Sequence, residues 1–367
     1  MRKKNMIFTI ICSILLSSII FFYDADKLGI RNEKLTKHEF EKKHMDEELN
    51  CLHFIEKKLS SKAGGIHTNY LDTKERTNLA SGHEILSESE GLIMLYYVKN
   101  NNKALFDQHF EFVRKNMMTK KGGIKWRVRE GNNNLTSSAA SIDDLRVVHA
   151  LLEAYTKWKE KEYYELMCKI SKYTLKNSTY KEILTNRYED HDIDLSYIDV
   201  YTIKLLEDKK WDKIYNHSLD IIEKGYISDE FPLYKKEYHI NTKKYLNTKR
   251  INMIDSLLVV LHLSEVGLVK EKTIDWIGNE LLNKGKIYSD YDLSTETHSG
   301  NGESTAVYSI IARIAKNIGN EALYDKAIRK MINLQVNDPS SKIYGSFGDI
   351  NTLQVYSFDN LQALLAF

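Results

Sequence analysis

Two carboxylates stand at the beginning of an apolar segment with the length of a helix, Glu88 and Glu90 within residues 85–98. Ser87 is predicted to be the N-cap of this helix, and the helix dipole favours negative charge in a first turn. Acids at this place are therefore ordinary helix chemistry. A carboxyl group beside apolar side chains can also be desolvated enough to keep its proton near neutral pH and act as a general acid. The residue types leave both interpretations open.

The helices that would position these acids recur with a regular break. A helical segment with apolar residues at three- and four-residue steps (residues 49–59) runs into Gly64-Gly65 and a short extended stretch. A second one runs into Gly122-Gly123, so the two breaks lie 58 residues apart, from position 64 to position 122. Weaker breaks at residues 230–233, 285–288 and 342–345 continue this spacing. One further break is predicted near Tyr180.

After each break the chain returns to an apolar helix, predicted at residues 88–99, 142–157, 195–207, 253–265, 305–316 and 358–367. Six breaks with a helix on either side give twelve helices. A single hairpin cannot bury its own apolar face, so such units stack or close on themselves. We predict an all-α fold, an (α/α)6 toroid of six helical hairpins with short extended segments in the loops. The N-termini of its inner helices would line a common funnel.

Aromatic residues are frequent in the predicted loops of this chain, which holds 23 tyrosines and 12 phenylalanines. Aromatic faces can stack on the C–H faces of sugar rings, and a phenol can also hydrogen-bond to sugar hydroxyls. Tyr70, Trp126 and Tyr288 are therefore candidates for sugar binding. The alternative is that these rings only pack the loops onto the helix ends.

Several windows, in order along the chain, resemble glycoside hydrolase family 8, whose members have an (α/α)6 barrel. Residues 87–95 are similar to the family's Ser-Glu-Gly-x-Gly-Tyr-Gly-Met-Leu, and residues 140–146 to its Ala-Thr-Asp-Ala-Asp-Leu-Asp. Residues 194–201 and 225–231 resemble its Pro-Ser-Tyr-Phe-x-Pro-x-Ala-Tyr and Gly-Leu-x-Pro-Asp-Trp segments, and residues 252–258 align with its Tyr-Asp-Ala-x-Arg. The resemblance spans roughly residues 45–367.

The resemblance implies roles for four residues. Glu88 matches the family's proton donor, Asp255 its general base, and Asp144 the acid that binds sugar at the cleavage point. Tyr197 lies in the third window and is expected to contact substrate. Inversion needs one protonated carboxyl group and one carboxylate that activates water on the opposite face of the sugar ring. Asp255 could instead be only the N-cap of its helix.

The chain differs from the family at four positions within these windows, which are Ile142, Arg146, Ile254 and Leu258. The sugar therefore cannot be carried over from the family. Two alternatives to a hydrolase stay open on the same fold. One is a polysaccharide lyase or unsaturated-uronyl hydrolase, and the other is a non-catalytic glycan-binding protein.

The charge balance and the absence of several motifs limit the partners and cofactors that this chain can be expected to bind. Lysine and arginine (53) balance aspartate and glutamate (51), for a net charge of +2, so the chain lacks the basic footprint of a nucleic-acid-binding protein. The sequence has no His-Glu-x-x-His motif, no glycine-rich phosphate loop and no Gly-x-Ser-x-Gly elbow. We therefore predict neither a metal nor a cofactor.

The N-terminus has the pattern of an export signal. Three basic residues precede an uncharged stretch at residues 6–23, and no small-residue cleavage site follows. We predict a signal-anchor at residues 1–23, a tether at 24–44 and a catalytic domain at 45–367; cleavage after the signal would instead give a secreted protein. Cys51 and Cys168 are the thiols of the exported part, so at most one disulfide can form, and the sequence leaves this open.

These observations predict a monomeric, inverting, endo-acting glycoside hydrolase at the outer face of the cell membrane. Its substrate would be an extracellular or nascent polysaccharide. The anchor points to a membrane-bound polysaccharide synthase as a partner.

Overall fold

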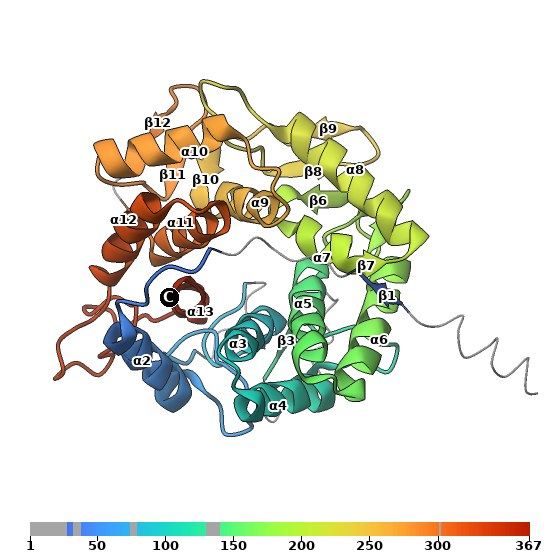
Figure 1. Ribbon diagram of the computed structural model, residues 1–367, viewed down its shortest axis with the longest axis horizontal. Helices are drawn as coiled ribbons and strands as arrows, with labels where there is room; N and C mark the ends of the chain where they lie inside the picture. Colours follow the sequence, from blue (N-terminus) through green and yellow to red (C-terminus); the bar gives the residue numbers. More distant parts are fainter. Residues whose placement is uncertain (1–27, 32–37, 74–78, 130–139, 301) are drawn as a thin grey trace, which may run out of the picture.

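The computed structural model describes residues 28–31, 38–73, 79–129, 140–300 and 302–367, and within these the helices form two concentric rings (Figure 1). The inner ring consists of α3 (Ser87–Lys99), α5 (Ser141–Trp158), α7 (Val200–Leu205), α9 (Met253–Glu265), α11 (Thr305–Ile318) and α13 (Ser357–Ala366). The outer ring consists of α2 (Met45–Phe54), α4 (Lys103–Phe112), α6 (Lys161–Asn177), α8 (Lys209–Gly225), α10 (Glu271–Gly278) and α12 (Glu321–Ile332).

The inner ring closes on itself. Each inner helix contacts the next one along the chain, and α13 returns to contact α3. The helix α13 also contacts α2, so the last described helix pairs with the first one (Figure 1). This order and closure match the predicted (α/α)6 toroid.

The two rings differ in how their side chains are buried. Inner helices such as α9 and α11 are buried on nearly every face, because they contact inner neighbours on both sides and outer helices behind. Outer helices are amphipathic. In α8 the buried residues recur at three- and four-residue steps, which is the spacing of one helix face.

One inner helix is shorter than predicted. Residues 195–207 were expected to be helical throughout, but Leu195–Tyr197 form a 3-10 turn and α7 begins only at Val200. Asp199 is the reason for this start, because its side chain caps α7 by accepting a hydrogen bond from the backbone N–H of Thr202 at 2.9 Å. The third inner helix therefore begins five residues later than predicted.

The predicted breaks between helices are present. Gly64 and Gly122 both have positive φ, and each is enclosed by an isolated bridge, Ser60 with Ile66 and Met118 with Ile124. The break expected near Tyr180 is a tight hairpin of β4 (Thr179–Tyr180) and β5 (Ile183–Leu184). The repeat therefore reflects a repeated turn geometry.

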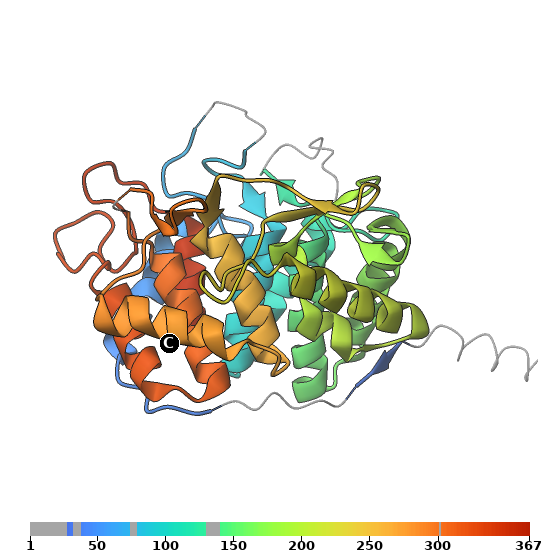
Figure 2. The same ribbon diagram turned by 90° about the horizontal axis from the view of Figure 1, so that it is seen from above.

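The larger strand pairs gather at one end of the barrel (Figure 2). There β2 (Ile85–Leu86) pairs with β3 (Arg127–Val128), and two three-stranded antiparallel sheets have the orders β6-β8-β9 and β10-β11-β12. The strands of these sheets are β6 (Asp192–Asp194), β8 (Glu237–His239), β9 (Lys244–Tyr245), β10 (Arg250–Asn252), β11 (Asp290–Asp292) and β12 (Thr297–His298).

Described residues of the predicted tether pack on the opposite end of the barrel (Figure 2). There β1 (Gly29–Ile30) pairs antiparallel with β7 (Leu206–Glu207), and Nη1 of Arg31 donates to the carbonyl of Lys204 at 2.9 Å. The ring of Phe40 lies 5.0 Å from that of Tyr324. These parts of residues 24–44 therefore belong to the helical body and do not stand free of it.

The predicted signal-anchor at residues 1–23 lies outside the described residues. In the described part of the chain, no helix combines the length and the apolar character needed to cross a membrane. Cys51 and Cys168 are both buried, and the disulfide that the sequence left open is not formed.

The closest approach of α3 to α5 depends on a glycine. A Cβ atom at Gly91 would lie 2.9 Å from Cβ of Arg146, which is shorter than a normal contact. We expect Gly91→Ala to lower the free energy of unfolding by about 1–3 kcal/mol, because the two inner helices would have to separate. Gly278→Ala in α10 is the control: nothing lies within 4 Å there, and alanine favours the helix by about 1 kcal/mol. Thermal unfolding checks both, and equal stability of Gly91→Ala and wild type would contradict the tight contact.

Candidate active site

A cavity of about 480 Å³ opens where α3 and α5 begin, at the same end of the barrel as the larger strand pairs. Carboxylates dominate its polar lining, with two guanidinium groups and two aromatic rings beside them. The acids are Glu88, Asp143, Asp190, Asp192 and Glu237, the cations Arg146 and Arg187, and the rings Trp126 and Tyr197. Such a lining can bind a neutral chain with many hydroxyl groups and can move protons.

Glu88 is held at the mouth of α3 by the strand pair in front of it. The backbone N–H of Ser87 donates to the carbonyl of Trp126 at 3.0 Å, which continues the pairing of β2 with β3 into the helix. The Glu88 side chain is 25% exposed, and its Oε1 accepts a hydrogen bond from Nη1 of Arg146 at 2.8 Å. The predicted proton donor therefore faces the cavity.

Ser87 does not have the predicted role of N-cap. Leu86 holds that position, without a side-chain hydrogen bond, and Ser87 is the first residue of α3. Its Oγ lies 3.0 Å from Oδ2 of Asp143 on the neighbouring helix α5. The hydroxyl therefore joins two inner helices.

Arg146 binds two carboxyl groups through one nitrogen. Its Nη1 lies 2.9 Å from Oδ1 of Asp143, in addition to its bond with Glu88. Arg146 and Asp143 are each only 7% exposed. Burial raises the pKa of Asp143 to about 7, and the charge of Glu88 adds to this, while Arg146 and Ser87 act against it. Two acids and one cation thus form a connected group.

Asp144, the acid expected to bind sugar, does not line this cavity. It is fully buried, and its Oδ2 accepts a hydrogen bond from Thr174 on α6 at 2.9 Å. Burial raises the pKa of this carboxyl group well above its usual range. One residue along a helix turns a side chain by about 100°. Asp143 therefore faces the cavity and Asp144 faces the outer ring.

Asp255 lies in the first turn of α9 but is not its N-cap. Asn252 has that role, because its side-chain oxygen accepts from the backbone N–H of Asp255 at 3.2 Å. The alternative that Asp255 serves only as a cap is therefore wrong. Its side chain is 31% exposed, and Nζ of Lys236 lies 3.9 Å away.

The surroundings of Asp255 are acidic. Burial raises the pKa of Asp255, and the charges of Asp194 and Asp290 act in the same direction against Lys236. Asp255 is not among the residues that line the cavity. Its neighbour Asp194 is paired in register with Glu237, and Glu237 does line the cavity. The predicted base thus adjoins the cavity through this carboxyl pair.

The predicted sugar-binding aromatics divide into two groups. Trp126 and Tyr197 line the cavity with Glu88. Tyr70 instead lies 5.7 Å from the ring of Phe54, and Tyr288 stacks on His298 at 3.8 Å. Neither of these two rings lines the cavity that contains Glu88.

Besides Asp143, four charged residues of the cavity were not singled out in the sequence. Arg187, Asp190 and Asp192 come from the segment that leads through β6 into the third inner helix, and Glu237 comes from β8. This segment occupies the same place in the repeat as those that lead to Glu88 and Asp144. That position was the available signal for the first three.

Glu90 supports the site from behind. It is fully buried, and its Oε1 accepts from the backbone N–H of Ile66 at 2.8 Å. Its Oε2 lies 2.8 Å from Nδ1 of His109 on α4. The second acid of the opening motif therefore fixes the loop after Gly64-Gly65 and an outer helix to α3.

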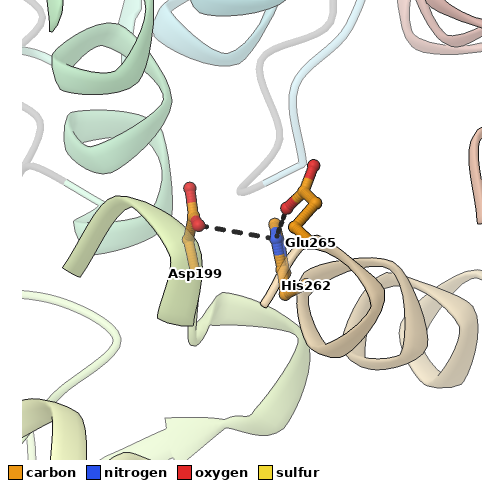
Figure 3. A group of neighbouring side chains, drawn as sticks. All are labelled: Asp199, His262 and Glu265. Carbon is orange, nitrogen blue, oxygen red and sulfur yellow. Dashed lines mark hydrogen bonds and ion pairs between the residues drawn. The ribbon is translucent and has the colours of Figure 1, made fainter. Parts of the chain in front are cut away.

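Among the described residues, one group of side chains comes close enough to hold a metal ion: Asp199, His262 and Glu265 (Figure 3). Nδ1 of His262 lies 3.1 Å from Oε2 of Glu265 and 3.5 Å from Oδ1 of Asp199. Nη2 of Arg313 also lies 3.9 Å from Oε1 of Glu265. The guanidinium group of Arg313 already supplies a positive charge that acts with both carboxylates.

The pKa of Glu265 reflects the charges that surround it. Burial alone would raise the pKa of Glu265, but the hydrogen bond from His262 and the charges of His262 and Arg313 lower it. None of the three side chains lines the cavity that contains Glu88. The group therefore serves as a buried ion-pair network in the barrel wall.

Comparisons with known proteins point to one family. The family model described as glycosyl hydrolases family 8 matches residues 68–184, a segment that contains Glu88, Asp143 and Arg146. The chain is similar to a solved structure named a novel alpha-amylase from Clostridium perfringens, with 40% identity and a TM-score of 0.83, covering 88% of this chain and 96% of that one.

Two further similarities are more distant. Endoglucanase Cel10, a family 8 glycosyl hydrolase from Klebsiella pneumoniae, has the same fold, with 15% identity and a TM-score of 0.63 over 86% of this chain and 97% of that one. A Bacillus subtilis (strain 168) protein named "Putative lipoprotein YdaJ" is 25% identical over 310 residues, which cover 82% of this chain and 84% of that protein.

Proposed function

Because the chain belongs to the glycosyl hydrolases family 8 and is therefore a glycoside hydrolase, we propose that it cleaves a polysaccharide internally, with inversion, and that Glu88 is the proton donor. The observation that carries this proposal is the position of Glu88. Its carboxyl group faces a cavity with Trp126 and Tyr197, and it is fixed by Arg146. Aromatic rings beside a positioned acid are what binding and cleavage of a sugar chain require.

The chemistry divides between two carboxyl groups. Protonated Glu88 gives its proton to the glycosidic oxygen as the bond from this oxygen to the anomeric carbon breaks. A water molecule attacks that carbon from the opposite face and gives a proton to a carboxylate. The other acids of the cavity would stabilise the positive charge that develops on the sugar ring.

We propose Asp255 as the carboxylate that accepts the proton of the water. Three features support this assignment: it begins a different inner helix from Glu88, it is free of capping duty, and its side chain is partly exposed. Glu237 is the second candidate, because it lines the cavity itself. Burial raises the pKa of Glu237, and its pairing with Asp194 adds to this effect.

Two substrates distinguish the residue that acts as the acid from the residue that acts as the base. Cleavage of a polysaccharide needs a proton for the leaving oxygen, whereas a glycosyl fluoride releases fluoride without one. We expect Glu88→Gln to slow polysaccharide cleavage about 10²–10⁴-fold while keeping most of the fluoride hydrolysis. We expect Asp255→Asn to lose both activities, with Glu237→Gln as the matched variant.

The assays are reducing-end release, fluoride release and the anomeric configuration of the first product by proton NMR, which should be inverted. Unchanged polysaccharide cleavage by Glu88→Gln would refute the acid assignment. Loss of fluoride hydrolysis in Glu237→Gln but not in Asp255→Asn would transfer the base role to Glu237.

We further propose that the substrate is an α-1,4-glucan. The support is the 40% identical protein named an alpha-amylase, since the endoglucanase at 15% identity is informative only about the fold. The cavity lining holds five carboxylates against two guanidinium groups, which disfavours polyanionic chains.

A panel of soluble starch, mixed-linkage β-glucan and polygalacturonate tests the substrate. We expect reducing ends and a rapid fall in polymer length from starch alone, without the ultraviolet absorbance of unsaturated products that a lyase would give. Cleavage of the β-glucan but not of starch would contradict the α-glucan proposal while leaving the family assignment intact.

We also infer that the enzyme acts outside the cytoplasm. The basic and then uncharged N-terminus and the similarity to a protein named as a lipoprotein support export. Because β1 packs at the end of the barrel opposite the cavity, an anchor before it would leave the cavity facing away from the membrane. A membrane-bound polysaccharide synthase stays the proposed partner.

A further inference from the structure

A proton donor beside an arginine presents a physical conflict. Nη1 of Arg146 lies 2.8 Å from Oε1 of Glu88, and a cation at this distance favours the ionised carboxylate. A general acid must carry its proton when the substrate arrives. Some other feature of the site has to keep a proton available.

The geometry around Arg146 supplies that feature. The same nitrogen lies 2.9 Å from Oδ1 of Asp143. Because this nitrogen contacts both oxygens, Oε1 of Glu88 and Oδ1 of Asp143 lie no further apart than twice this distance. One cation can compensate one of the two negative charges. Two carboxyl groups this close, one of them buried, do not ionise independently and together retain a proton to higher pH.

Ser87 can accommodate this proton on Asp143. Its Oγ lies 3.0 Å from Oδ2 of Asp143 and 3.3 Å from the carbonyl oxygen of Trp126. A hydroxyl group has one proton to donate and can also accept. When Asp143 is ionised, Ser87 donates to it. When Oδ2 is protonated, it donates to Ser87, and Ser87 donates to the Trp126 carbonyl.

We propose that Glu88 and Asp143 hold one proton between them, that Asp143 stores it in the free enzyme, and that Arg146 positions the pair. This inference rests on the proposed role of Glu88 as proton donor. When a sugar occupies the cavity, the O–H bond of Asp143 breaks and an O–H bond forms on Glu88, while Arg146 pairs with the Asp143 carboxylate. Glu88 then gives this proton to the glycosidic oxygen.

Other charges act on the pair from the surrounding elements. The charge of Asp143 in turn raises the pKa of Asp144 on α5 and of Tyr197 in the 3-10 turn, and Asp199 at the start of α7 acts on Arg146. Across the cavity lie Arg187, Asp190, Asp192 and Glu237. All of these stay in place in the variants below, so differences between the variants report on Asp143 and Arg146.

The pH dependence of kcat/KM on soluble starch tests the proposal through two shifts of opposite sign. Asp143→Asn removes one of the two carboxyl groups that share the proton, so the alkaline limb should move to lower pH by about one unit. Arg146→Met removes the cation, so this limb should move to higher pH. Arg146→Lys keeps the charge and should return it toward the wild-type position.

The outcomes separate this inference from the proposed function. If Glu88→Gln cleaves starch as well as wild type does, the acid assignment fails. If Glu88→Gln is inactive but Asp143→Asn and Arg146→Met lower kcat at every pH without moving the limb, only the shared proton is refuted.

Thermal unfolding gives a test that needs no substrate. Because the pKa of Asp143 is raised above its unfolded value, the folded state binds more protons than the unfolded state between roughly pH 4 and 7. The stability that this proton contributes is present at low pH and is lost as the pH rises through this window. Asp143→Asn cannot titrate, so its Tm relative to wild type should increase from pH 5 to pH 8.

Glu41→Gln is the matched control for this measurement, because the Glu41 side chain is 79% exposed. Its Tm should follow that of wild type across the same pH range. A constant difference in Tm between Asp143→Asn and wild type would overturn the stored proton.

Discussion

The candidate active site depends on one buried cation, the guanidinium group of Arg146. It pairs with Glu88 on α3 and with Asp143 on its own helix, and no more than 7% of Arg146 or Asp143 is exposed. A buried charge without a partner is costly, so removing this cation would leave the negative charge of the Glu88–Asp143 pair uncompensated. The glycine at position 91 lets α5 come close enough to α3 for the pairing to form.

Charge balance continues from the cavity into the barrel wall. The charge of Asp199 acts on both Arg146 and Arg313, and Asp199 also adjoins His262 and Glu265 (Figure 3). The inner helices thus combine nearly continuous apolar burial with a few charged residues that compensate one another. In α7 the same aspartate also fixes the start of the helix. The charges of the cavity and those of the barrel wall are therefore parts of one connected arrangement.

Sequence patterns predicted the helix order and the acid at the mouth of α3, because both depend on local periodicity and on a strict repeat. They did not distinguish Asp143 from Asp144, since neighbouring residues differ by about 100° around a helix and only the packed neighbour decides which one faces the cavity. Arg146 appeared as a departure from the family, and its pairing with Glu88 is a contact between two helices. Glu237 comes from a strand whose partner lies more than forty residues earlier, at Asp194.

The N-terminal residues show a different limit. Their charged composition is typical of a solvated tether, yet β1 completes a strand pair with β7 and Arg31 reaches the end of α7. Two-residue strands carry almost no periodic signal, so such pairing depends on the tertiary structure.

The central claim is that Glu88 delivers a proton to a glycosidic oxygen in the cavity beside Arg146. The most direct test is a crystal structure of Glu88→Gln with a maltooligosaccharide longer than the cavity. The account predicts a chain that crosses the cavity against Trp126 and Tyr197, with one glycosidic oxygen about 2.6–3.2 Å from the amide of the glutamine. An oligosaccharide bound with every glycosidic oxygen beyond hydrogen-bond reach of position 88 would contradict it.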